Sequence, residues 1–237
     1  MSNPYTLVFG QSPVEMIDRT AQLENIISTF TAERPSNYIN LVTGIRGCGK
    51  TVFLTQLAKR FEKNKDWIVI NLNPQRDLLL NLAAKLSGVK TLGMIFKEAK
   101  INLQAFGLGV EIEGAAPIWD IEDALIKMLK AIKKKGKRIL ITIDEVVNSK
   151  DMRIFTSSYQ IFLREDLPVF LVMTGLYKNI DRLRNSDGMT FLERAPRTVL
   201  SPLNKNAIIN NYVETISVKE HVATKLEINS THTETDL

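Results

Sequence analysis

Two kinds of apolar spacing alternate along the chain. Short continuous apolar runs are typical of strands that a parallel sheet buries on both faces, whereas apolar residues three and four positions apart indicate helices with one buried side. Strands are predicted at 38–43, Trp67–Leu72, Arg138–Ile143, 169–174 and Arg197–Leu200. Helices are predicted before the first strand, at 23–30, and between the strands, at 54–61, 78–86, 121–132 and 154–162.

Other stretches give weaker patterns. Residues 92–106 could be helical, and the alternating residues 108–113 (LGVEIE) indicate a strand or hairpin inserted into the pattern. Residues 12–15 (SPVE) have the arrangement of a capping box, which predicts a short helical turn there. A last helix is predicted at about 204–216, followed by a polar tail.

The regular alternation of strands and helices predicts an α/β fold with a parallel sheet of about five strands, covered on both faces. One main domain is expected for 237 residues that are 44% hydrophobic and 24% charged. We divide the chain into an N-terminal helical segment at 1–35 that packs on the core, the core itself at 36–203, and a C-terminal helix with a polar tail at 204–237.

The composition indicates the cellular compartment in which the protein is expected. Cys48 is the only cysteine, which excludes an internal disulfide framework and a multi-cysteine metal site and suits a reducing compartment. The first residues lack the pattern of a secretion signal, and no apolar stretch is long enough to cross a bilayer. We therefore expect a cytoplasmic protein without a membrane partner.

Charge changes this picture little. The net charge of +5 permits contact with a polyanion, but it comes mostly from lysines interspersed along the chain. The densest basic run, 130–138 (KAIKKKGKR), falls where a helix is expected to end. We interpret the run as a solvated helix terminus rather than a nucleic-acid patch, because cations are favourable at that end of a helix.

A glycine-rich loop follows the first predicted strand and precedes a predicted helix. Glycines let successive backbone N–H groups converge on a phosphate, and the helix N-terminus adds positive charge. Lys50 is expected to reach the β- and γ-phosphates of ATP, and Thr51 to offer its hydroxyl to Mg²⁺. The alternative is a tight glycine turn without a ligand. The loop satisfies G-x-x-x-x-G-K-[ST] with Gly44, Ile45, Arg46, Gly47, Cys48, Gly49, Lys50 and Thr51.

A pair of acids follows the third predicted strand. Asp144 and Glu145 come at its carboxyl end, the edge at which parallel sheets bind ligands. We predict that Asp144 holds Mg²⁺ through its water shell beside Thr51. We predict that Glu145 orients or deprotonates the water that attacks the γ-phosphate. Solvated loop residues or a helix cap are the alternative interpretation of this pair.

With these motifs the sequence resembles P-loop ATPases of the AAA+ class, especially the archaeal ATPase family and ATPases similar to origin-recognition proteins. The resemblance covers roughly residues 16–203 and rests on GIRGCGKT, ILITIDE, VFLVMTG and FLERAPRTVLSPL. It implies a three-layer P-loop NTPase fold, with Thr174 as a sensor near the γ-phosphate and residues 16–19 near the adenine. It implies that an arginine finger, if there is one, is Arg194 or Arg197. A plain strand-end threonine and surface ion pairs are the alternatives.

The C-terminal part departs from this class. No arginine follows Arg197, so the helical lid with its second sensor arginine is expected to be reduced or absent. We expect an ATPase that binds ATP and Mg²⁺ and uses hydrolysis for a conformational switch or remodelling step. A homo-oligomer and DNA are open as partners. A nucleotide-gated binding module with negligible turnover, or a P-loop kinase with a small-molecule acceptor, is the alternative.

Overall fold

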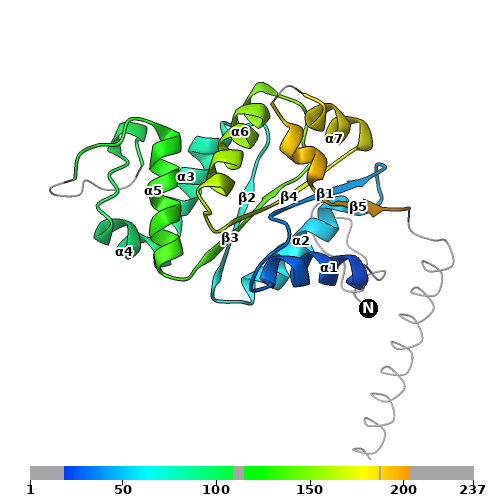
Figure 1. Cartoon of the computed structure of the whole chain (residues 1–237), viewed down its shortest axis with the longest axis horizontal. Helices are drawn as coiled ribbons and strands as arrows, with labels where there is room; N and C mark the ends of the chain where they lie inside the picture. Colours follow the sequence, from blue (N-terminus) through cyan, green and yellow to red (C-terminus); the bar gives the residue numbers. More distant parts are fainter. Residues whose placement is uncertain (1–18, 109–114, 187, 203–237) are drawn as a thin grey trace, which may run out of the picture. The chain divides into compact units, whose positions relative to one another are not determined.

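A computed structural model describes residues 19–108, 115–186 and 188–202. Its compact unit, Thr20–Ser201, contains the helices and strands labelled in Figure 1. The strands are β1 (Ile39–Gly44), β2 (Trp67–Leu72), β3 (Arg138–Ile143), β4 (Val169–Gly175) and β5 (Arg197–Leu200). The α-helices are α1 (Thr20–Thr31), α2 (Lys50–Glu62), α3 (Leu78–Gly88), α4 (Lys90–Glu98), α5 (Ile121–Lys134), α6 (Lys150–Arg164) and α7 (Tyr177–Arg184). Two short 3₁₀ helices are η1 (Gln104–Phe106) and η2 (Thr190–Arg194).

The strands form one sheet in the order β2-β3-β4-β1-β5, and every neighbouring pair is parallel. The carboxyl ends of all five strands therefore meet at one edge. Strand β1 lies between β4 and β5, with Thr43 opposite Gly175 and Gly44 opposite Leu200. The loop that leaves β1 thus begins beside the ends of both neighbouring strands.

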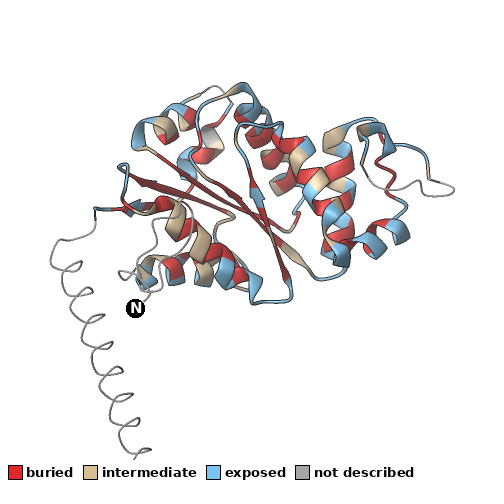
Figure 2. Cartoon of the chain, turned by 180° about the vertical axis from the view of Figure 1, so that it is seen from behind, coloured by how far each residue is buried: buried red, intermediate tan, exposed pale blue. Residues whose placement is uncertain are grey.

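Alternating side chains of the strands enter two separate apolar cores. On β3, Ile139, Ile141 and Ile143 pack in the core that α3, α4, α5, α6 and α7 cover. Leu140, between them, packs in the core on the other face, with residues of α1 and α2 such as Phe30. Figure 2 shows the central strands buried along most of their length. Burial on both faces explains why these strands read as continuous apolar runs.

Polar residues fix where several helices begin. The side chain of Asp77 accepts a hydrogen bond from the N–H of Leu80, and the side chain of Asp120 accepts one from Asp123. The Ser149 hydroxyl accepts from the N–H of Met152 in the same way. Each of these bonds satisfies a backbone donor that the first turn of a helix leaves without a partner, which is worth about 1 kcal/mol.

The α/β fold with a five-stranded parallel sheet is confirmed. The predicted strands agree with the observed strands to within one residue at each end. The five predicted helices are also present, and each observed helix is somewhat longer than its apolar stripe.

Two parts of the chain differ from the prediction. The possible helix at 92–106 is instead α4, which ends at Glu98, and the short helix η1. Lys100 lies between them with φ of 51°, a left-handed conformation that an α-helix cannot contain. Helix α7 was not predicted, because its sequence YKNIDRLR buries only Ile180 and Leu183.

Some predictions concern residues outside the described ranges. These are the helical turn at 12–15, most of the strand or hairpin at 108–113, and the helix at 204–216. The domain boundaries at 35 and 203 stay predictions. Helix α1 itself packs on the sheet through Leu23, Ile26 and Phe30.

In the described part of the chain, no single helix has both the length and the apolarity to cross a membrane. Helices α3 and α4 meet those criteria only when taken together, across a bend of 97°.

Candidate nucleotide-binding site

The glycine-rich loop connects β1 to α2 at the carboxyl edge of the sheet. Gly47 and Gly49 adopt left-handed backbone conformations, with φ of 76° and 87°. A β-carbon at either position would meet no atom within 4 Å, so the loop borders open space there. Helix α2 begins at Lys50, directly after Gly49, and its first N–H groups therefore lie at the loop. Such an end of a helix favours an anion.

The base of the loop is closely packed against β5. A β-carbon on Gly44 would lie 2.4 Å from Cys48 Sγ and 2.6 Å from the carbonyl oxygen of Leu200. Only glycine fits this position. Cys48 is 2% exposed and belongs to the core under α1 and α2, so its side chain faces away from the open side of the loop.

Lys50 supplies a buried cation to the loop. Its side chain is 8% exposed, and its Nζ donates to the carbonyl oxygens of Gly44 at 3.1 Å and Ile45 at 2.7 Å. No carboxylate among the described residues lies within ion-pair distance of it. Its Nζ also lies 4.0 Å from Cys48 Sγ. A buried ammonium whose partners are neutral retains a strong preference for an anion.

Asp144 joins the loop to the neighbouring strands. It follows β3 on the face that α2 covers, two positions after Thr142. Its Oδ2 accepts a hydrogen bond of 2.6 Å from the Thr51 hydroxyl. Its Oδ1 accepts from the Thr174 hydroxyl at the end of β4 and from the N–H of Glu145 at 3.0 Å. The carboxylate is therefore fixed by α2, by β4 and by the backbone of the next residue.

Glu145 occupies a turn that directs its side chain outward. Its φ is 53°, which is uncommon for a residue other than glycine, and its side chain is exposed. The N–H of Glu145 donates to the Thr174 hydroxyl at 3.2 Å, and the N–H of Val146 donates to the Thr174 carbonyl at 2.9 Å. Since Val146 is fully buried in the core, it anchors the turn. Unusual backbone geometry of this kind is often found at functional sites.

The donor set fits a nucleoside triphosphate with Mg²⁺. The loop offers backbone N–H groups, the start of a helix and the Lys50 ammonium, all of which suit phosphates. Thr51 and Asp144 offer oxygen atoms, which Mg²⁺ prefers, and they are few enough to leave room for water and phosphate oxygens.

Comparison with known proteins agrees with this geometry. Residues 16–164, more than half of the chain, match the model of a family described as "ATPase domain predominantly from Archaea". The chain belongs to this family. The matched part of the ATPase domain contains the glycine-rich loop, Asp144 and Glu145, and it ends before Thr174. No curated protein sequence matches the chain.

Solved structures with the same fold include Cdc6p from Pyrobaculum aerophilum, which is 17% identical with a TM-score of 0.56. The Aeropyrum pernix ORC1 protein, solved in complex with DNA, is 15% identical with a TM-score of 0.55. The alignment with Cdc6p covers 87% of the present chain, and the alignment with ORC1 covers 85% of it. Each alignment covers 51% of the other protein's chain. The chain thus spans about half the length of the structures it matches. At these identities the likeness establishes the fold alone.

Among the described residues, no hydrogen bond or ion pair joins either predicted arginine to the cluster around Asp144. Arg197 pairs in the sheet with Leu41, three residues before Gly44, and its guanidinium forms an ion pair with Asp181 of α7. Arg194, at the end of η2, is exposed and forms no ion pair with another described residue. Of residues 16–19, predicted near the adenine, only Arg19 lies within the described ranges.

The site of this ATPase domain has one contributor that sequence patterns did not indicate. Asn148 follows the acidic turn, and its side-chain amide donates to the carbonyl oxygen of Arg182 in α7 at 3.2 Å. Its Oδ1 accepts from Arg153 of α6 at 3.0 Å. Asn148 therefore ties the turn that carries Glu145 to α6 and α7. The only sign of this in the sequence is that Asn148 is a polar residue three positions after Glu145.

Proposed function

We propose that this ATPase domain binds ATP with Mg²⁺ and hydrolyses it, and that the result is a conformational switch or remodelling step. The observation that carries the proposal is the hydrogen-bonded cluster of Thr51, Asp144, Thr174 and the N–H of Glu145 beside the glycine-rich loop. A phosphate loop alone binds nucleotide. The cluster fixes Asp144 as a ligand for the metal, and the carboxylate of Glu145 follows Asp144 directly in the chain.

Each group has a defined part in the proposed reaction. The loop N–H groups and Lys50 hold the β- and γ-phosphates. Thr51 and Asp144 hold Mg²⁺, which when bound would neutralise charge on the phosphate oxygens. Glu145 orients a water molecule in line with the γ-phosphate and accepts its proton. Its exposed side chain and fixed backbone suit this part.

ATP turnover without an added acceptor tests the proposal. Glu145→Gln is expected to keep nucleotide affinity and to lower kcat roughly 10²-fold or more, because the amide can orient water but is not a base. Lys50→Ala is expected to abolish tight ATP binding, measured with a fluorescent nucleotide. Glu62→Gln is a matched control, since Glu62 is exposed at the far end of α2.

The alternatives give different results in the same assay. ATP binding with no turnover by the wild type would mean a nucleotide-gated binding module. Turnover only with an added small-molecule acceptor would mean a kinase. We also propose DNA as a partner, because one protein of the same fold was solved in complex with DNA. Repeating the turnover assay with duplex DNA tests this, and an unchanged rate and no DNA binding would contradict it.

A further inference from the structure

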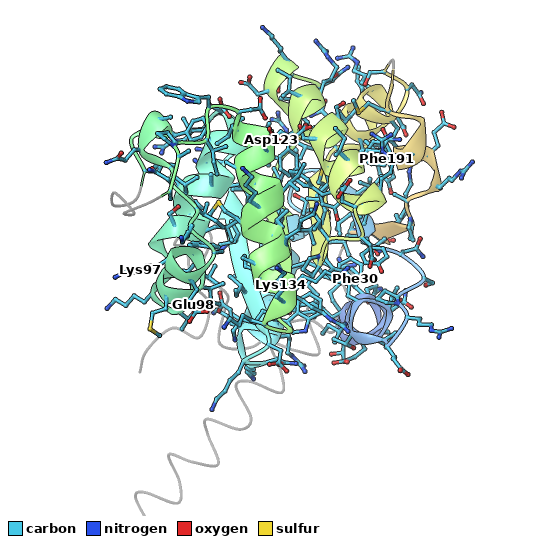
Figure 3. The ribbon with its side chains drawn as sticks, turned by 60° about the vertical axis from the view of Figure 1, so that its left-hand side comes forward. Phe30, Lys97, Glu98, Asp123, Lys134 and Phe191 are labelled. Carbon is cyan, nitrogen blue, oxygen red and sulfur yellow. The ribbon has the colours of Figure 1, made fainter. Side chains whose placement is uncertain are left out.

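A groove of about 520 Å³ lies between α4 and α5, away from the glycine-rich loop. Figure 3 shows Glu98 of α4 and Lys134 of α5 on the neighbouring helices that border it. Lys134 is the last residue of α5, four residues before β3 begins, so this groove is near the amino edge of the sheet. The nucleotide site is at the carboxyl edge. We call this feature the α4–α5 groove.

Four lysines border the α4–α5 groove, and two of them form no ion pair with another described residue. Lys127, Lys130 and Lys134 recur at helical spacing and form one stripe along α5. Lys130 pairs with Glu165 at 2.9 Å, and Lys135 pairs with Glu98 of α4 at 2.8 Å.

Lys127 and Lys134 form no ion pair or hydrogen bond with another side chain in the described ranges. The groove lining contains four ammonium groups and one carboxylate, so its field is positive.

The floor of the α4–α5 groove is apolar. Ile95 lines it from α4, Ala131 lines it from α5, and Ala99 and Ile101 line it just after α4. Met94, one turn before Glu98 on α4, is 74% exposed. An exposed methionine on the same helix can adapt to the apolar side chains of another protein.

These features favour a protein segment over a nucleic acid. Phosphates would satisfy Lys127 and Lys134, but they would leave the apolar floor uncovered and would approach Glu98. A peptide that carries both carboxylates and apolar side chains would satisfy the lysines and cover the floor together.

We propose that the α4–α5 groove binds an acidic segment of a partner protein, with apolar side chains of that segment on the groove floor. The carboxylates of the segment pair with Lys127 and Lys134. The partner would thus bind at the opposite edge of the sheet from the nucleotide.

Fluorescence anisotropy with the full chain tests this binding. The probe is a fluorescein-labelled synthetic helical peptide with leucines on one face and glutamates beside them. Two counterparts carry serine for leucine or lysine for glutamate. We expect the probe to bind about tenfold or more tightly than either counterpart, because each lacks one of the two interactions.

Two variants locate the binding. Lys127→Glu with Lys134→Glu is expected to weaken binding about tenfold or more, because both free cations become anions. Lys59→Glu with Lys63→Glu, in and just after the last turn of α2, makes the same charge change elsewhere and should leave the affinity unchanged. Ala99→Trp fills the groove without changing charge and should also abolish binding, whereas Ala99→Ser should not.

Other outcomes would overturn the proposal. Equal affinity for the probe and its serine counterpart would mean that the apolar floor has no part. Equal loss of binding in both lysine pairs would mean attraction by net charge alone. If a labelled duplex DNA binds through Lys127 and Lys134 and the peptide does not, the occupant is a nucleic acid. Circular dichroism of every variant excludes unfolding as the cause.

Discussion

At the scale of single residues, Gly44 links the phosphate loop to the sheet. A methyl group there would overlap Cys48 Sγ and the backbone oxygen of Leu200, and the backbone of β5 cannot move aside cheaply. Gly44→Ala should therefore lower the free energy of unfolding by about 1–3 kcal/mol, measured by urea denaturation.

Gly93→Ala is the control for that substitution. A β-carbon on Gly93 of α4 meets no atom within 4 Å, so this variant should gain up to about 1 kcal/mol of stability from helix propensity. Equal stability of the two variants would contradict the close packing at Gly44.

Thr174 is expected to position Asp144 for the metal. Thr174→Val removes the hydroxyl that bonds Asp144 and the N–H of Glu145 while keeping the volume of the side chain. The Mg²⁺ concentration needed for half-maximal ATP binding should rise roughly 10–100-fold, as for other residues that orient metal ligands. Thr174→Ser should restore the wild-type value. If serine is as defective as valine, the hydroxyl is not the relevant group.

The candidate site was largely predictable at this scale because its chemistry is local in sequence. Eight consecutive residues make the phosphate loop, and Asp144 with Glu145 directly follows an apolar run. The contact of Thr174 with Asp144 was not predictable, because it depends on the register of β4 beside β3. The requirement for glycine at position 44 was not predictable from packing either, because it comes in part from Leu200, which is distant in the sequence.

At the scale of elements, Tyr159 fastens α6 to the sheet. Its hydroxyl is fully buried and is placed to donate to the carbonyl oxygens of Tyr38 and Val169, both at 2.9 Å. Tyr159→Phe should cost about 1 kcal/mol, because the Tyr38 carbonyl keeps its bond from the N–H of Leu171. Thermal unfolding measures the change.

The pH dependence of the same variant gives a second test. Burial raises the pKa of Tyr159 well above its ordinary value of 10.0, and a smaller contribution comes from Tyr38. The neutral phenol therefore contributes stability that is complete below pH 10 and is lost as the pH rises above it. The wild type should lose stability more steeply than Tyr159→Phe above pH 10. Parallel pH curves would show that Tyr159 does not resist ionisation.

Elements were predictable where burial alone decides their form. Strands β1, β3 and β4 are buried on both faces, and their continuous apolar sequences show this directly. Helix α7 is mostly polar and is held by tertiary contacts, including the bond from Asn148 to the Arg182 carbonyl. Helix α4 ends before Lys100, whose left-handed conformation no apolar pattern indicates.

At the scale of the whole molecule, we predict that hydrolysis requires self-association. Charge on the transferred phosphoryl group needs a cation beyond Lys50 and Mg²⁺, and an arginine finger supplies on the order of 10³-fold or more in kcat. Arg194 is exposed without an ion pair to another described residue, whereas Arg197 is bound to Asp181. Arg194 is thus more readily available to a neighbouring subunit. Specific activity should rise with protein concentration.

Mixing experiments identify the arginine. Chains with Arg194→Ala and chains with Arg197→Ala are each assayed alone and mixed with Glu145→Gln chains. The variant that lacks the finger should be inactive alone and regain activity in the mixture, because each chain supplies the group that the other lacks, and we expect this of Arg194→Ala. Arg182→Ala, an exposed position on α7, is the control and should remain active by itself. Activity per chain that is independent of concentration and survives loss of both arginines would indicate a monomeric switch.

The strand order also determines when the chain becomes able to bind a nucleotide during its synthesis. Strand β4 is fourth along the chain but lies between β3 and β1, and β5 covers the other side of β1. A nascent chain that reaches only α6 already contains the phosphate loop and both carboxylates, yet its β1 has no neighbour to pair with. Such distant pairings form slowly. We therefore expect nucleotide binding to arise only after β4 and β5 have left the ribosome. A bound nucleotide would then stabilise the completed sheet by mass action.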